Sequence, residues 1–206
     1  MERVLIVAKT HMKSGVCLGG LTRTQNKGVR LLPPNRPHYP ADTRFDVGQV
    51  WDLELHAATD IEPPHCEDVF VTGAQFVAQI ANTREILLER IHPWQGGPEQ
   101  LYDGLLQVSG GKGYISEHNA IPTMSTGFWI ADRPLILKYS LDHDQIKPNY
   151  RVGDAAAALN IPFVGFAEPL KQIPAGTLLR VSLARWFDQN GRTERRCYLQ
   201  LSGWYL

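Results

Sequence analysis

The sequence predicts an all-β protein, rich in strands with a short helical insert, that is built as two small β-barrels. Short apolar runs rich in β-branched residues dominate both ends of the 206-residue chain. The run 49–56 alternates apolar and polar side chains with the period of two that a half-buried strand requires. Helical spacing of apolar residues occurs only in the middle, over residues 81–107. Periodicity alone is compatible with a sandwich as well as with a barrel.

Residues 1–80 are assigned to the first barrel, because they contain enough predicted strands to close one. An Asn-Lys-Gly turn at 26–28 predicts a hairpin, and proline pairs at 33–34 and 63–64 end strands. The strands are expected over residues 4–8, 16–23, 29–32, 49–56 and 68–77.

Residues 81–113 are expected to form a helical insert or linker. Asn82 or Thr83 supplies an N-cap, and a Gly-Gly-Pro stretch divides the segment into two short helices. Residues 114–206 are assigned to the second barrel, where an Asn-Gly pair between the last two β runs predicts a hairpin. Its strands are expected over residues 128–131, 135–139, 150–152, 178–183 and 197–205.

The composition excludes several classes of protein. Hydrophobic residues make up 43% and charged residues 20% of the chain, which is typical of a folded globular protein and not of a disordered one. No apolar run approaches the roughly 18 residues that span a bilayer, and the first residues lack the apolar core of a signal peptide. Three widely spaced cysteines indicate reduced thiols. We therefore expect a cytoplasmic protein without a membrane partner.

The formal net charge is zero, but the charges are segregated along the chain. Residues 1–40 carry seven basic and one acidic side chain, a net charge of +6. Residues 41–110 carry three basic and twelve acidic side chains (−9), and residues 111–206 carry eleven and eight (+3). The equal numbers of basic and acidic residues exclude a strongly cationic, histone-like protein. The uneven distribution of these charges along the chain is informative about binding partners rather than about the fold.

Several stretches of the sequence resemble one known family. They are the run Val4–Lys9, the turn and strand Lys13–Gly20, the strand Gly28–Pro33, the block from Asp52 to Asp68 with its Pro-His-x-Glu loop, and the hairpin Val181–Gly203. Together they are similar to the bacterial dual OB-containing domain family over nearly the whole chain. The resemblance implies two OB folds and, by analogy with OB folds in general, nucleic-acid binding. It also implies a phage-defence or mobile-element setting.

The basic N-terminal segment is the first candidate site. Its cations fall at strand ends and turns, from which they can reach one face and hold a nucleic-acid backbone. Only Tyr39 offers a stacking surface in the first forty residues. The alternatives are a solvated basic surface, or a basic patch that docks on the acidic segment 41–110 of the same chain. The candidate residues are Lys9, Lys13, Arg23, Lys27 and Arg30.

The C-terminal hairpin is the second candidate, because guanidinium and aromatic groups together bind single strands. Trp186 and Phe187 are adjacent, so a regular strand cannot bury both. Trp204 and Tyr205 are equally consistent with a role in closing the hydrophobic core. The candidate residues are Arg185, Trp186, Arg192, Arg195 and Arg196.

Signatures of metal binding and catalysis are incomplete. The His-Cys-Glu-Asp run at 65–68 lacks paired Cys or His modules. The Gly-rich turn 109–113 fails the spacing of a phosphate loop, although it is able to meet an anion. The Asp-His-Asp triplet at 142–144 has no matching carboxylates, and Cys17 beside His11 lies in an apolar strand pattern. We therefore predict no metal, no cofactor and no catalytic residue.

The sequence thus predicts a non-catalytic module that binds single-stranded DNA or RNA through its two basic ends. Two alternatives from other classes remain open. One is a protein-interaction module that offers the acidic segment 41–110 to a basic partner. The other is a metal-dependent nuclease or hydrolase that uses Asp142 or Asp144.

Overall fold

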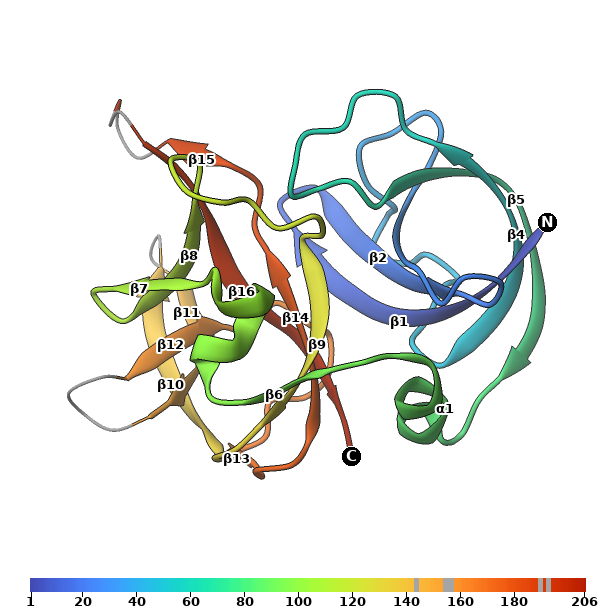
Figure 1. The fold of residues 1–206 in the computed structure, drawn as a ribbon. Helices are drawn as coiled ribbons and strands as arrows, with labels where there is room; N and C mark the ends of the chain where they lie inside the picture. Colours follow the sequence, from blue (N-terminus) through green and yellow to red (C-terminus); the bar gives the residue numbers. More distant parts are fainter. Residues whose placement is uncertain (143–144, 154–157, 189–190, 192–193) are drawn as a thin grey trace. The chain divides into compact units, whose positions relative to one another are not determined.

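The structure, a computed structural model, divides the chain into two compact units, Met1–Ile91 and His92–Leu206 (Figure 1). Both are built mainly from strands, which confirms the predicted all-β class. The boundary lies within the segment that the sequence assigns to an insert. The structure describes all residues except 143–144, 154–157, 189–190 and 192–193.

The first unit is a closed five-stranded barrel in the order β1-β2-β3-β5-β4, in which β4 pairs with β1. All neighbours are antiparallel except β3 and β5, which are parallel. A small closed barrel of this kind is the architecture of an OB fold. The strands are β1 (Glu2–Met12), β2 (Gly15–Thr22), β3 (Gly28–Leu32), β4 (Gln49–Ala57) and β5 (Asp68–Gln79).

Alternating apolar side chains fill this barrel, as the period of two requires. Gly20 keeps the wall close to the core, because a Cβ there would lie 2.5 Å from Cγ1 of Val4. The loop between β3 and β4 closes the barrel, since Tyr39 and Phe45 pack against its interior. The buried core consists of Val4, Ile6, Val16, Leu18, Val29, Leu31, Phe45, Trp51, Leu53 and Val71.

The helix α1 (Thr83–Arg90) ends the first unit. Asn82 is its N-cap and accepts a hydrogen bond of 3.4 Å from the backbone N–H of Glu85. This confirms one of the two caps that the sequence predicts. Arg90 lies in the last turn, where a cation favours the helix dipole.

The second unit contains two sheets, in the orders β12-β11-β10-β13 and β6-β9-β14-β16-β8-β7, and β15 pairs with β16. A 3₁₀ helix, η1 (Pro98–Gly104), follows the first of its strands. The strands are β6 (Trp94–Gly96), β7 (Gln107–Ser109), β8 (Lys112–Ser116), β9 (Thr126–Ala131), β10 (Leu135–Asp142), β11 (Gln145–Val152), β12 (Leu159–Pro162), β13 (Gln172–Ile173), β14 (Leu178–Leu183), β15 (Phe187–Asp188) and β16 (Arg195–Tyr205).

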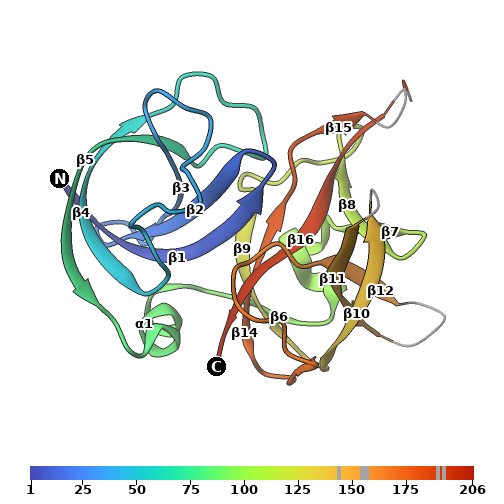
Figure 2. The same ribbon diagram turned by 180° about the vertical axis from the view of Figure 1, so that it is seen from behind.

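These two sheets together form an opened version of the first barrel (Figure 2). Only residues 132–134 separate β9 from β10; β9 pairs with β14 and β10 pairs with β11. The two strands together therefore take the place of β1. A single parallel bridge, Phe163 with Leu201, stands where β3 and β5 pair in the first unit.

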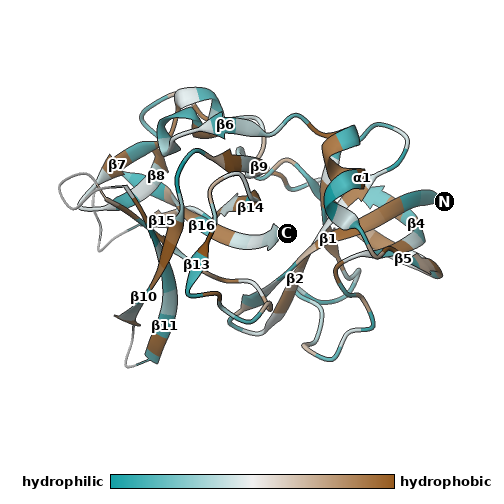
Figure 3. Ribbon diagram, turned by 90° about the horizontal axis from the view of Figure 1, so that it is seen from below, coloured by the Kyte–Doolittle hydropathy of each residue, from teal (hydrophilic) through white to brown (hydrophobic). Residues whose placement is uncertain are grey.

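One core joins the two sheets of the second unit, and Trp129 and Tyr150 are its largest fully buried side chains besides Tyr102. Burial raises the pKa of Tyr150 to about 12, and its hydroxyl donates to the carbonyl of Leu170 (2.8 Å). Hydrophobic and hydrophilic segments alternate along strands of both units (Figure 3). Among the described residues, no helix has the length and apolar character needed to cross a membrane.

We predict that Gly20→Ala destabilises the first unit by roughly 1–3 kcal/mol, because overpacking a filled barrel forces the wall outward. Urea unfolding measures the change. Gly203→Ala is the control, since no atom lies within 4 Å of the added Cβ. It should stay within about 0.5 kcal/mol of the parent. Equal losses in both variants would contradict the close approach at Gly20.

Candidate nucleic-acid interface

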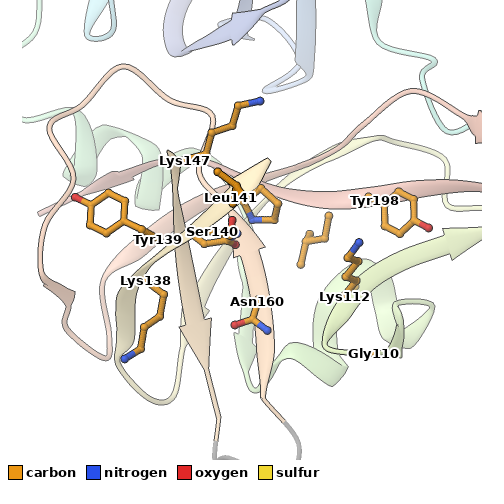
Figure 4. A pocket seen from close by; sticks show the side chains of 13 residues that line it. Gly110, Lys112, Lys138, Tyr139, Ser140, Leu141, Lys147, Asn160 and Tyr198 are labelled. Carbon is orange, nitrogen blue, oxygen red and sulfur yellow. Dashed lines mark hydrogen bonds between the residues drawn. The ribbon is translucent and has the colours of Figure 1, made fainter. Parts of the chain in front are cut away.

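A pocket of about 550 Å³ opens on the second unit (Figure 4). Strands β10, β11 and β12 contribute one part of its lining, and the β7–β8 hairpin and β16 contribute the other. The polar and aromatic side chains in the lining are Lys112, Lys138, Tyr139, Ser140, Lys147, Asn149, Asn160 and Tyr198.

Strand register explains why polar side chains gather here. Lys138 lies opposite Asn149 and Ser140 lies opposite Lys147, so these four residues share one face of the β10–β11 pair. Tyr150, on the opposite face of β11, is buried in the core. The amide nitrogen of Asn149 donates to the hydroxyl of Ser140 (2.8 Å), which fixes the two side chains against each other.

One aromatic ring lies beside the polar face of the pocket (Figure 4). It is that of Tyr198, with the ammonium of Lys112 at 6.0 Å from its ring centroid. Tyr139 is 62% exposed, but it lies on the face of β10 opposite to Lys138 and Ser140. From Tyr198 the row continues away from the pocket through Tyr114, 6.1 Å from Tyr198, to the guanidinium of Arg196, 4.0 Å from the Tyr114 ring. Two cations therefore flank two adjacent aromatic rings, of which Tyr114 is buried.

The described lining of the pocket is electropositive, because it contains three lysines and no carboxylate. Lys112 and Lys138 form no ion pair with any residue that the structure describes. A concave site lined by charges of one sign concentrates counter-ions from solution. The positive charge and the aromatic side chain of this pocket suit a flexible polyanion that carries planar aromatic groups.

The predicted cations of the first unit do not converge on one groove. Lys9 and Lys13 lie toward the β1–β2 turn, whereas Arg23 and Lys27 lie in the loop at the other end of β2. Eight residues of strand separate the two turns, roughly 25 Å at the usual rise. Arg30 lies between them on β3 and pairs with Asp68.

The acidic segment neutralises several cations of the basic start, which is one of the alternatives that the sequence leaves open. Arg3 forms two hydrogen bonds with Asp52 (2.8 and 2.9 Å), and Lys9 pairs with Asp46 (2.8 Å). The hydrogen bond from Arg3 lowers the pKa of Asp52. These carboxylates and Asp68 are therefore engaged within the first unit.

Carboxylates also hold two arginines of the C-terminal hairpin. Arg195 pairs with Glu117 (2.7 Å) and lies 5.4 Å from the ring of Trp186, and Arg196 pairs with Glu194 (2.6 Å). Trp186 packs against the core, while Phe187 is 53% exposed. Arg185 is exposed. Arg192 lies outside the residues that the structure describes.

In the described part of the chain, no three His, Cys, Asp or Glu side chains come together as a metal site would require. His65 and Glu67 of the Pro-His-x-Glu loop are buried beside β5. Cys17 is half-buried on β2. Of the Asp-His-Asp triplet, positions 143 and 144 lie outside the description.

Sequence reasoning found part of the pocket and missed the rest. The sequence predicts that the Gly-rich turn containing Lys112 is able to meet an anion. Arg196, a predicted contact, lies outside the pocket beside Tyr114. Lys138, Tyr139 and Lys147 are missed because no motif marks them. Their signal is the alternation of polar and apolar residues along 135–141, which places Lys138 and Ser140 on one face.

Comparisons with known proteins identify a family. The family model of the dual OB-containing domain matches residues 2–204. No curated protein sequence matches the chain.

Solved structures to which the chain is similar include a murine DNA-binding protein bound to double-stranded DNA (10% identity, TM-score 0.31, covering 97% of this chain and 91% of that one). Another is the Ifi202 HINa domain with 20-bp double-stranded DNA (9% identity, TM-score 0.36, covering 99% and 95%). The p204 HINb domain has 9% identity and a TM-score of 0.36, covering 97% and 95%. Likeness at this level carries no information on what the present chain binds.

We predict that Arg30 is a structural residue. Burial raises the pKa of Asp68, and Arg30→Met would leave that carboxyl buried without its cation. The variant should lose roughly 3–5 kcal/mol of unfolding free energy at neutral pH. A carboxyl whose pKa is raised by folding destabilises the folded state once it is ionised. The loss of unfolding free energy in the variant should therefore shrink as the pH falls toward about 4, where the Asp68 carboxyl is protonated. Arg30→Met with Asp68→Leu should recover most of it; a binding role for Arg30 predicts no such recovery.

Proposed function

Because the chain belongs to the dual OB-containing domain family, we propose that it is a non-catalytic module that binds single-stranded DNA or RNA in the pocket of its second unit. One observation carries the proposal. Three lysines and Tyr198 line a concave site, and no carboxylate among the described residues lines it. Lysines hold phosphates, and tyrosines stack on unpaired bases of any sequence.

The position of the pocket in the fold supports this assignment. OB folds bind oligonucleotides on the face of their second and third strands. In the second unit these strands correspond to β11 and β12, which contribute Lys147, Asn149 and Asn160 to the pocket. In the first unit they are β2 and β3, which contain no aromatic residue and whose one cation, Arg30, is paired. The second unit therefore offers the better binding face.

The remaining parts of the function stay predictions. A bacterial phage-defence or mobile-element setting rests on the family resemblance, and a cytoplasmic location rests on the cysteines. A protein partner for the acidic segment also stays a prediction, although the ion pairs of Asp46, Asp52 and Asp68 reduce the charge that such a partner would meet.

We predict modest and salt-sensitive affinity for single strands. Three phosphate contacts give a slope of log K against log salt of roughly −2, and each of Lys112→Ala and Lys138→Ala should reduce its magnitude by about 0.7. Fluorescence anisotropy with labelled oligonucleotides of DNA and RNA measures the slope, and a duplex of the same sequence should bind more weakly. Lys171→Ala is the charge-matched control, because Lys171 is exposed in the same unit but does not line the pocket.

The absence of binding to any single strand at low salt would refute the proposal. A slope that changes as much in Lys171→Ala as in Lys138→Ala would refute the site.

We predict that Tyr198→Ala weakens single-strand binding by about 5- to 150-fold, because stacking on an aromatic ring contributes roughly 1–3 kcal/mol per base. Phe187→Ala is the control, since it removes an exposed ring outside the pocket, from the hairpin that the sequence singles out. Its affinity should equal that of the parent. The reverse order would move the interface from the pocket to the C-terminal hairpin.

A further inference from the structure

A second pocket, of about 230 Å³, lies on the first unit and brings three arginines together. Arg3 comes from β1, Arg23 from the loop between β2 and β3, and Arg90 from the last turn of α1. The apolar lining comes from Leu5, Val50 and Ile80.

Two of these guanidinium groups are held in fixed orientations. Asp52 accepts two hydrogen bonds from Arg3, and Arg90 donates to the side-chain oxygen of Asn26 (2.8 Å) and to the carbonyl of Thr22 (2.6 Å). A guanidinium has five N–H donors, so each keeps donors for a ligand. The orientation is therefore in place before any ligand arrives, which lowers the entropic cost of binding.

The third guanidinium, that of Arg23, makes no side-chain hydrogen bond or ion pair with the described residues. Burial and then the charge of Arg23 lower the pKa of Arg90, so the two cations repel each other. Two carboxylates, those of Asp52 and Glu2, lie near these arginines. Asp52 is occupied by Arg3, and Glu2 accepts hydrogen bonds from the backbone N–H (2.8 Å) and hydroxyl (2.7 Å) of Thr24.

We propose that this pocket binds a phosphate group, either free inorganic phosphate or the terminal group of a phosphate monoester. Three guanidinium groups from three separate elements suit a tetrahedral anion, whose oxygens point in different directions. A planar carboxylate needs only one guanidinium fork. The pocket belongs to the first unit, and the inference does not depend on nucleic-acid binding by the second.

Isothermal titration calorimetry at low ionic strength, with chloride as the only other anion, tests the proposal. The probes are inorganic phosphate, uridine 5′-monophosphate and uridine. We expect saturable one-to-one binding of at least one of the two phosphate probes and none of uridine. Tighter binding of the nucleotide identifies a monoester as the ligand, and tighter binding of inorganic phosphate identifies the free ion.

The Arg23→Gln variant localises the site. It should weaken phosphate binding roughly tenfold or more, as the loss of a charge-assisted contact does. It should fold like the parent, because Arg23 has no side-chain partner to lose in the described structure. Lys27→Gln removes a matched exposed charge from the same loop outside the pocket and should leave the affinity unchanged. No saturable binding, or equal weakening in both variants, overturns the proposal.

Discussion

The parallel contact between the third and fifth strands distinguishes the two units at the place where the second unit has its pocket. In the first unit β3 pairs with β5 from Arg30 to Leu32, and the buried ion pair of Arg30 and Asp68 lies at the start of this contact. In the second unit the corresponding contact is a single parallel bridge between Phe163 and Leu201. Where this wall is opened in the second unit, a pocket lies between β12 and β16.

Opening a barrel leaves strand edges whose backbone groups need partners. The β7–β8 hairpin meets this need, since β8 pairs with the first residues of β16 and the carbonyl of Gly111 accepts from the N–H of Asn160 on β12 (2.8 Å). The same hairpin brings Lys112 to the pocket. The hairpin that pairs with the strand edges of the second unit therefore also contributes a positive charge to the pocket. Strand pairing and ligand binding thus depend on the same short turn.

The fold was largely predictable from local patterns, because alternation along 49–56 and the proline pairs depend on neighbouring residues alone. The short strands β8 and β12 gave no such pattern, since four or five residues next to Gly-rich turns carry too little periodicity. The site was less predictable. Whether a cation is available depends on partners distant in sequence: Asp52 is 49 residues from Arg3, and Asp46 is 37 residues from Lys9. Register, which places Lys138 beside Asn149, is equally non-local.

A net charge of zero therefore conceals two kinds of positive site. Ion pairs engage Arg30, Arg195 and Arg196, whereas Lys112 and Lys138 form no ion pair with any described residue, and Arg3 keeps free donors although it pairs with Asp52. Lysines remain in the second unit, and their flexible point charges suit a mobile chain of phosphates beside stacking rings. Oriented arginines remain in the first unit, and their rigid forks suit one phosphate held in place. The difference in side chain between the two pockets thus indicates a difference in ligand: a polymer in one and a single group in the other.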